Sequence, residues 1–381
     1  MRKVYVSHNN IISSLGFTSE AVVKNIHNEV SGLQKINDKT ILPEPCYTSL
    51  IPTKKLESSF FELNPKSDYT RLEQMMISSL STIIEASNIV LNERVGLIIS
   101  TTKGNVDALD DHNPFHKDRA YLSELAHQVA DFFNFKNDPI VVSNACVSGL
   151  LAVAVAKRFI NEGVYDHVFI TSGDVITEFI LSGFNSFQAL SNAPCKPFDK
   201  NRMGVNIGEV TASVLVSHDS SQLVEEAVEI LGEGSCNDAN HISGPSRTGE
   251  GLYRSMQSAF DQANLTAHDI DYISAHGTAT SFNDEMEAIA FNRMHLNEVP
   301  LNSLKGYFGH SLGASGLVET IVGMHSLKNN TLYKSLGFEN LGVSQPINVI
   351  ANTTQKSLQT FLKTASGFGG CNTAILFQKT N

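Results

Sequence analysis

Three residues of this sequence have the chemistry of a covalent catalyst: one cysteine and two histidines. Cys146 follows the apolar segment 140–142 and precedes an apolar helix predicted over 147–161. A cysteine at a helix N-terminus faces unpaired backbone N–H groups and the positive end of the helix dipole, which favour the thiolate over the thiol. The alternative is a buried, inert cysteine that packs as a small hydrophobic residue.

The two histidines favour the reactive alternative. His276 lies in the segment AHGTAT and His310 ends the segment KGYFGH, although either one by itself could equally be a structural or surface histidine. A cysteine hydrolase needs one histidine as its base. Two neutral imidazoles can both donate to one carbonyl oxygen and stabilise an enolate, as the decarboxylation of a malonyl thioester requires.

Two further features fit acyl transfer. Lys305, five residues before His310, would lower the pKa of a nearby histidine and keep it neutral; the alternative is an ordinary surface lysine. The Gly-rich segment 367–370 could bring a second backbone N–H close to that of Cys146, so that both bind the oxyanion of an acyl intermediate. This segment could also be a plain turn or a phosphate cradle.

Strands and helices alternate along the chain, which predicts an α/β fold with a largely parallel sheet. Apolar runs predict strands, and helical spacing of apolar residues predicts helices. The expected strands are 4–6, 95–99, 140–142, 168–173, 211–217, 271–274 and 374–378. The expected helices are 19–28, 69–87, 118–135, 147–161, 247–264, 284–296 and 313–328, with Ser19 and Asn283 as N-caps of the first and sixth. We expect residues 30–68 to be irregular surface.

The chain shows signs of an internal duplication. Residues 148–150 and 315–317 both read Ser-Gly-Leu, and each opens a helix rich in small residues. Each half then closes with a Gly-containing loop and an apolar strand. These matches predict two similar halves, 1–225 with the nucleophilic cysteine and 226–381 with both histidines.

Composition restricts the class of protein. The 381 residues are 41% hydrophobic and 18% charged, as in an ordinary globular protein. The five cysteines are scattered without a C-x-x-C pair, which argues against zinc and disulfides and favours a reducing compartment. A net charge of -11 argues against nucleic-acid binding. No apolar run approaches a membrane span, so we expect a cytoplasmic protein without stable membrane insertion.

Four blocks of sequence together resemble the β-ketoacyl-acyl carrier protein synthases, condensing enzymes of the thiolase superfamily with a Cys–His–His triad. The blocks are residues 197–209, 238–242, 269–287 and 303–319. The resemblance covers nearly the whole chain. It implies a thiolase-like five-layer αβαβα sandwich of two similar halves. It also implies decarboxylative Claisen condensation, in which an acyl chain grows by two carbons.

The resemblance also implies a role for each catalytic residue. Cys146 would take the acyl chain from an acyl carrier protein. His276 and His310 would bind the malonyl thioester and promote its decarboxylation, and Lys305 and Glu319 would order that site. No cofactor is implied, because the phosphopantetheine arrives on the carrier protein.

Further residues would contact the substrate. Phe368 would act as a gate and lend its N–H to the oxyanion hole, with Gly367 and Gly369 beside it. Thr278 and Thr280 would contact the phosphopantetheine arm. Asp284 would lie behind this site and is grouped with the substrate-binding residues.

The resemblance implies two kinds of protein partner. Carrier proteins of these systems are acidic, and Lys66 and Arg71 lie where the resemblance places docking residues; the alternative is the solvated start of a helix. Related proteins form dimers through the strand before the nucleophile, so we expect a homodimer or a heterodimer with another ketosynthase-like chain.

Departures from the family pattern favour a specialised pathway, such as an aryl polyene or type II polyketide pathway, over general fatty-acid synthesis. Ser366 and Cys371 stand where phenylalanine and threonine are common, and residues 210–212 replace a Gly-Ala-Gly. The main alternative function is a non-catalytic chain-length partner of another ketosynthase. A thiolase, with Cys371 as its second cysteine, and a cysteine hydrolase are less favoured.

Overall fold

A continuous mixed sheet organises the fold in the computed structural model, which describes residues 2–37, 42, 44–66, 68–238 and 244–380. Among these residues, ten strands form the sheet in the order β11-β10-β14-β15-β9-β1-β8-β6-β4-β5. Their bounds are β1 Tyr5–Ser13, β4 Val95–Ser100, β5 Ile140–Val142, β6 His167–Asp174, β8 Val210–Ser217, β9 Val228–Asn237, β10 Tyr272–Ser274, β11 Leu301–Asn302, β14 Thr360–Ser366 and β15 Cys371–Lys379.

The strand order repeats. When the strands β1, β4, β5, β6 and β8 are numbered 1 to 5 in chain order, they lie side by side in the sheet in the order 3-2-4-5-1. The strands β9, β10, β11, β14 and β15, numbered in the same way, lie in the same order. The pattern of parallel and antiparallel pairs is also the same, and the two sets meet where β1 pairs with β9. The division at residues 225 and 226, which falls between β8 and β9, stays our prediction of the domain boundary.

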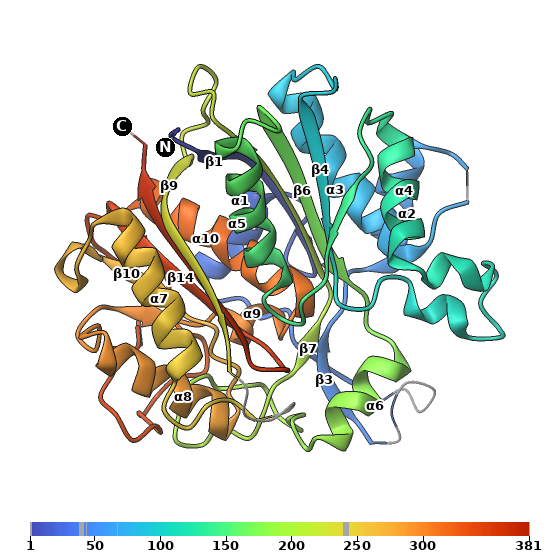
Figure 1. Cartoon of the computed structure of the whole chain (residues 1–381). Coiled ribbons are helices and arrows are strands. Elements are labelled where there is room, and N and C mark those ends of the chain that lie inside the picture. The colour runs from blue at the N-terminus through green and yellow to red at the C-terminus, as the bar shows by residue number, and fades with distance from the viewer. Residues whose placement is uncertain (1, 38–41, 43, 67, 239–243, 381) are drawn as a thin grey trace.

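Helices complete five layers (Figure 1). Helices α5 (Ser148–Asn161) and α10 (Ser315–Asn329) pack on each other between the two halves of the sheet. Helix α3 (Arg71–Ser87) covers β1, β6 and β8 from outside, and α4 (Leu122–Phe133) packs beside it. Helix α7 (Glu250–Ala263) covers β9 and β15 on the other side, next to α8 (Ser281–Arg293). The expected αβαβα sandwich is confirmed.

The two Ser-Gly-Leu segments meet where α5 and α10 cross. A Cβ on Gly149 would lie 3.1 Å from the Cβ of Leu317, and one on Gly316 would lie 2.7 Å from the Cβ of Leu150. Each leucine therefore packs on the glycine of the other segment. This reciprocal contact brings the N-termini of the two helices close together and places Cys146 at their junction.

Several expected elements differ from the structure. Residues 30–68 contain β2 Gln34–Ile36, β3 Cys46–Ser49 and α2 Thr53–Leu63. The sequence showed no clear helical period for α2, because this helix buries only Leu56 and Phe60. The sheet is mixed rather than largely parallel. Strands β14 and β15 are joined by the short 367–370 loop, which forces them to pair antiparallel.

Several helix starts were also misplaced. Thr18, rather than Ser19, caps α1 (Ser19–His27). Helix α8 starts at Ser281 after Thr280, because Asn283 lies inside the helix and its side chain donates to Glu287. The predicted helices 118–135 and 313–328 begin with the 3₁₀ turns Lys117–Ala120 and Leu312–Ala314, so α4 and α10 start later than expected. The sequence did not predict β9, β11 or β14. It also did not predict α6 Glu178–Ser186, β7 Ile207–Gly208, α9 Lys305–Phe308, β12 Thr331–Leu332, β13 Thr354–Gln355 and the 3₁₀ turns Val106–Leu109 and Ala267–Asp269.

Of the helices in the described ranges, none has both the length and the apolar character needed to cross a membrane.

Candidate active site

Cys146 lies in a strained turn between β5 and α5. The preceding residue, Ala145, has a φ of +44°, which is rare for a residue with a side chain. The side chain of Ser148 holds the turn in place. Its hydroxyl donates to the carbonyl of Ala145 at 2.6 Å and accepts from the N–H of Asn144 at 2.8 Å. The turn therefore presents the cysteine at the helix N-terminus, as the sequence predicted.

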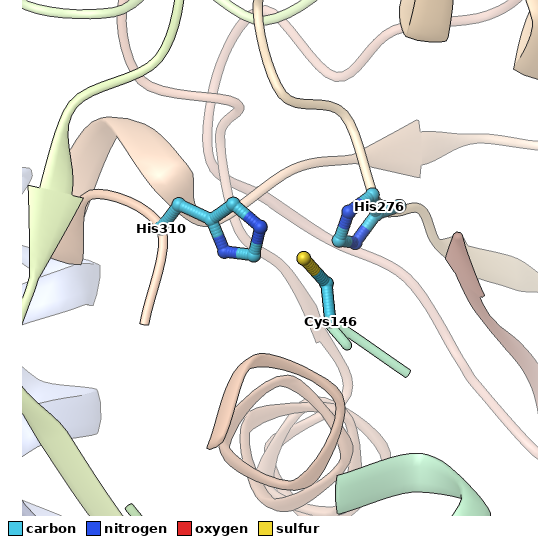
Figure 2. Close-up of side chains that lie close together, drawn as sticks. All are labelled: Cys146, His276 and His310. Carbon is cyan, nitrogen blue, oxygen red and sulfur yellow. The ribbon is translucent and has the colours of Figure 1, made fainter. Parts of the chain in front are cut away.

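Three separate elements bring the cysteine and both histidines together (Figure 2). His276 follows β10 and His310 follows α9. The sulfur of Cys146 and one ring nitrogen of each histidine lie within 4.8 Å of one another. The two imidazoles pack edge to face, with ring centroids 5.2 Å apart. One thiol and two imidazoles therefore face the same small volume.

The Cys146 side chain is a thiol at rest, so the expected thiolate is not found. Burial raises the pKa of Cys146 to about 12, and the neighbouring Cys371 acts in the same direction. Lys305, Lys103 and the backbone N–H of Phe368 lower the pKa, but less strongly. Desolvation dominates because the side chain is only 7% exposed. The proton must therefore leave as the sulfur attacks.

The hydrogen bonds of His310 fix its tautomer. Its Nδ1 accepts from the backbone N–H of Leu312 at 3.2 Å and lies 2.8 Å from the hydroxyl of Ser315. A backbone N–H can only donate, so the proton of the neutral ring is on Nε2. Burial, followed by the charge of Lys305, lowers the pKa of His310 well below 6.5. His310 is therefore a neutral donor at the site.

His276 has the same tautomer for a similar reason. The ammonium of Lys305 lies 3.4 Å from Nδ1 of His276 and donates to its backbone carbonyl at 2.5 Å. Lys305 in turn pairs with Glu319 at 2.9 Å. Burial, then Lys305, lowers the pKa of His276 well below 6.5. Both histidines thus offer an Nε2–H to a substrate oxygen.

The thiol and imidazoles have the spacing of a metal site, but their tautomers do not suit one. A metal-binding imidazole donates its other N–H to an acceptor. Here Nδ1 of His276 faces an ammonium, and Nδ1 of His310 faces a backbone N–H. Their Nε2 atoms therefore carry protons and have no lone pair for a metal. We keep the prediction that no metal takes part.

The 367–370 loop lies against the nucleophile. A Cβ on Gly367 would lie 3.0 Å from the backbone nitrogen of Cys146. The ring of Phe368 packs on Phe184 and Phe187, with centroids 5.6 and 5.4 Å apart. Phe368, the predicted gate residue, is therefore one of three adjacent phenylalanines.

A cavity of about 430 Å³ is lined by Cys146, His276 and His310. Thr278 and Thr280 lie in its wall, and their hydroxyls are 2.8 Å apart. The apolar lining includes Phe184, Phe187, Met203, Phe282, Met286 and Phe368. The cavity therefore offers a partly apolar space beside Cys146.

Comparison with known proteins assigns the family. The family models "Beta-ketoacyl synthase, N-terminal domain" and "Beta-ketoacyl synthase, C-terminal domain" match residues 10–221 and 227–339. The chain belongs to the beta-ketoacyl synthase family. The predicted family and acyltransferase class are confirmed.

Relatives of this synthase include the 3-oxoacyl-[acyl-carrier-protein] synthase 2 of Rhizobium meliloti, 31% identical over 283 residues, which are 70% of this chain and 67% of that protein. A putative mitochondrial 3-oxoacyl-[acyl-carrier-protein] synthase of Schizosaccharomyces pombe is 29% identical over 317 residues, 74% of each chain.

Solved structures show the same fold. The ketosynthase ApeO in complex with its chain length factor ApeC, from Xenorhabdus doucetiae, gives a TM-score of 0.86 at 22% identity, over 100% of this chain and 98% of that chain. The ishigamide ketosynthase/chain length factor gives 0.89 at 23% identity over the whole of both chains.

Other predicted site residues of the synthase lie farther from the thiol. Asp284 is fully buried behind the cavity, where its carboxylate accepts from the backbone N–H groups of Phe198, Thr278 and Ala279. Asp284 therefore orders the loop that carries Thr278 and Thr280 and does not face the cavity. Gly369 is exposed and, among the described residues, is not part of the cavity wall.

The two predicted docking residues differ in their surroundings. Lys66 is exposed ahead of α3. Arg71 instead forms a two-pronged ion pair with Glu209 and donates to the carbonyl of Ile51. In the family block 238–242, residues 239–242 lie outside the described residues, and Asp238 accepts from the N–H of Gly251.

Sequence reasoning missed three groups of the synthase site. Phe184 and Phe187 belong to the unpredicted α6 region, although their i, i+3 spacing was visible. Ser315, noted only as part of a repeat, contacts His310. Lys363 reaches Glu319 through strand pairing, and no local signal marks it.

Proposed function

We propose that this ketosynthase elongates a Cys146-bound acyl chain by decarboxylative condensation with malonyl-acyl carrier protein. In the first half-reaction the sulfur attacks the acyl thioester of a carrier protein. The new C–S bond forms as the bond to the phosphopantetheine sulfur breaks, and the thiol proton ends on the departing thiol. Backbone N–H groups of Cys146 and Phe368 are suited to bind the oxyanion.

In the second half-reaction, the two Nε2–H groups of His276 and His310 donate to the thioester oxygen of the malonyl group. Loss of CO₂ leaves an enolate, which both donors stabilise. Its carbon attacks the acyl-Cys146 carbonyl, the new C–C bond forms and the C–S bond breaks. The released thiolate of Cys146 takes up a proton from water, and the β-ketoacyl product stays on the carrier protein. The observation that carries the proposal is the pair of neutral, donor-oriented imidazoles beside one thiol.

The aromatic cavity wall supports a specialised pathway. Phe184, Phe187, Phe282 and Phe368 line the cavity, and conjugated or aryl acyl chains can stack on aromatic rings. We therefore favour an aryl polyene or type II polyketide pathway over general fatty-acid synthesis.

Intact-protein mass spectrometry tests the proposal. The wild type is incubated with a panel of acyl-carrier-protein thioesters beside Cys146→Ala, with the partly exposed Cys236→Ala as a matched control. We expect a mass gain from long or polyunsaturated acyl groups in the wild type and the control but not in Cys146→Ala. Gain from short saturated chains alone would favour fatty-acid synthesis. No adduct from any donor would favour the non-catalytic chain-length partner.

We also propose that an acidic carrier protein docks near Lys66. Lys66→Glu should weaken acyl transfer from the carrier protein but not from a small thioester. Arg71→Glu is less informative, because it would place a second carboxylate against Glu209. Equal loss on both substrates would reject the docking surface.

A dimer through the edge strand β5 and a cytoplasmic location stay proposals. In the described part of the chain, β5 pairs only with β4, and its other edge offers free backbone groups to a second strand. Light scattering of the protein, alone and with a ketosynthase-like partner, distinguishes a homodimer from a heterodimer.

A further inference from the structure

A second lysine lies in the catalytic centre, and the mechanism above does not use it. Lys363 is on β14 and is 0% exposed. Burying an ammonium is costly unless it is paired and hydrogen-bonded. Its Nζ donates to the carbonyls of Ser274, Ala275 and Thr364 at 3.0, 3.3 and 2.6 Å. The ammonium is therefore held in a cage of backbone oxygens.

The cage includes the backbone that leads into His276. Ser274 and Ala275 are the two residues before this histidine, and in the parallel β10–β14 pair Ser274 lies opposite Lys363. The lysine thus ties the end of β10 to β14. The Lys363 side chain therefore holds the backbone from which the His276 side chain extends.

Lys363 also shares a carboxylate with the catalytic lysine. Its Nζ lies 2.8 Å from Oε2 of Glu319, whereas Lys305 lies 2.9 Å from Oε1. Each oxygen of Glu319 therefore faces one ammonium. Because Lys305 contacts His276, Lys363, Glu319, Lys305 and His276 form one continuous chain of contacts.

We propose that Lys363 is a positioning residue for the decarboxylation step, holding the backbone before His276 and the Glu319–Lys305 pair in place. This inference rests on the role given to His276 in the proposed function. It adds a residue that acts mainly on one half-reaction, because Lys363 contacts the backbone just before the malonyl-binding His276 and the Glu319 carboxylate, rather than the Cys146 turn.

Several charged groups surround His276. Burial disfavours its protonation most, followed by Lys305 on α9, His310 and Lys363 on β14. Two acidic side chains are also close: Glu319 on α10 pairs with both lysines, and the carboxyl group of Glu287 on α8 accepts from the His276 backbone N–H. Replacing Lys363 by a neutral residue removes one of the cations. The pH at which His276 becomes protonated should then rise.

The test compares Lys363→Met with wild type in two separate assays. One measures acyl transfer to Cys146 by intact mass, and the other measures CO₂ release from malonyl-acyl carrier protein. Lys157→Met is the matched control, since Lys157 is also buried, on α5, and contacts Gln262 rather than the catalytic site. Lys363→Gln, which keeps N–H donors without the charge, serves if the methionine variant does not fold.

We expect acyl transfer to be unchanged and CO₂ release to fall about tenfold or more, the effect of a small displacement of the His276 ring. The acid limb of the CO₂-release profile should move to higher pH in both Lys363 variants, while Lys157→Met behaves as wild type. Equal losses in both half-reactions, or an unmoved pH profile in the folded variant, would overturn the inference. A wild type that releases no CO₂ would instead reject the proposed function.

Discussion

Glu319→Gln removes the carboxylate that two buried lysines share, and we expect a large loss of folding stability. The ammoniums of Lys305 and Lys363 lie 2.9 and 2.8 Å from its oxygens, and none of the three side chains is more than 3% exposed. Removing one partner of a buried ion pair costs about 3–5 kcal/mol. Both ammoniums keep backbone carbonyl acceptors, so we expect one such cost rather than two.

Equilibrium unfolding in urea measures this loss. In a cycle with Lys363→Met, the double variant should lose about 1–3 kcal/mol less than the sum of the single variants, because the orphaned ammonium is then gone. The exposed Glu57→Gln on α2 is the control and should leave the unfolding midpoint unchanged. A loss below about 1 kcal/mol, which is ordinary for any substitution, or strictly additive losses would refute the shared-carboxylate interpretation.

Three further predictions concern pH and packing. Release of CO₂ from malonyl-acyl carrier protein should keep its rate as the pH falls from about 7.5 to about 6, because burial and Lys305 lower the pKa of His276 and His310 well below 6.5; a rate loss centred near 6.5 would contradict neutral imidazoles. Burial, then Asp284, raises the pKa of Glu287 from 4.5 to about 7. The protonated carboxyl group therefore stabilises the folded protein fully at a pH below the pKa of the unfolded state. This stability is lost as the pH rises through the pKa of the folded state. Urea unfolding should therefore show wild type losing about 3 kcal/mol relative to Glu287→Gln between those values, and a constant difference would reject this. Gly316→Ala should destabilise the α5–α10 crossing by about 1–3 kcal/mol, since the added Cβ would lie 2.7 Å from the Cβ of Leu150; Gly183→Ala on α6, where nothing lies within 4 Å, is the control, and equal melting temperatures for the two variants would count against the close crossing.

Among the described residues, local patterns predicted most of the α-helices and most strands of the ten-stranded sheet. The helical period of residues 69–87 and the apolar run 95–99 depend on neighbours in sequence, and α3 and β4 follow them closely. The pattern failed in residues 30–68, where α2 is short and half exposed. It also failed at β9 and β14, which are defined mainly by pairing with β15.

The candidate catalytic residues could likewise be identified from the sequence. Cys146, His276, His310 and Lys305 lie in segments with little packing need for such residues, and the structure gathers all four. The protonation of these groups was not readable, because it depends on burial. The helix N-terminus suggested a thiolate at Cys146, whereas desolvation in the folded protein favours the thiol.

The sequence by itself therefore determined the family, the candidate reactive residues and the repeated α/β order, since each of these is written in short segments. The tertiary structure alone decided which atoms of those residues carry protons and face one another. Leu312 N–H and the Lys305 ammonium fix the protons on Nε2 of the two histidines, and Lys363 reaches the backbone before His276 from 89 residues away. Such contacts exist only after β10, β14 and α10 have packed, because charge and proton placement depend on the low-dielectric surroundings that folding creates.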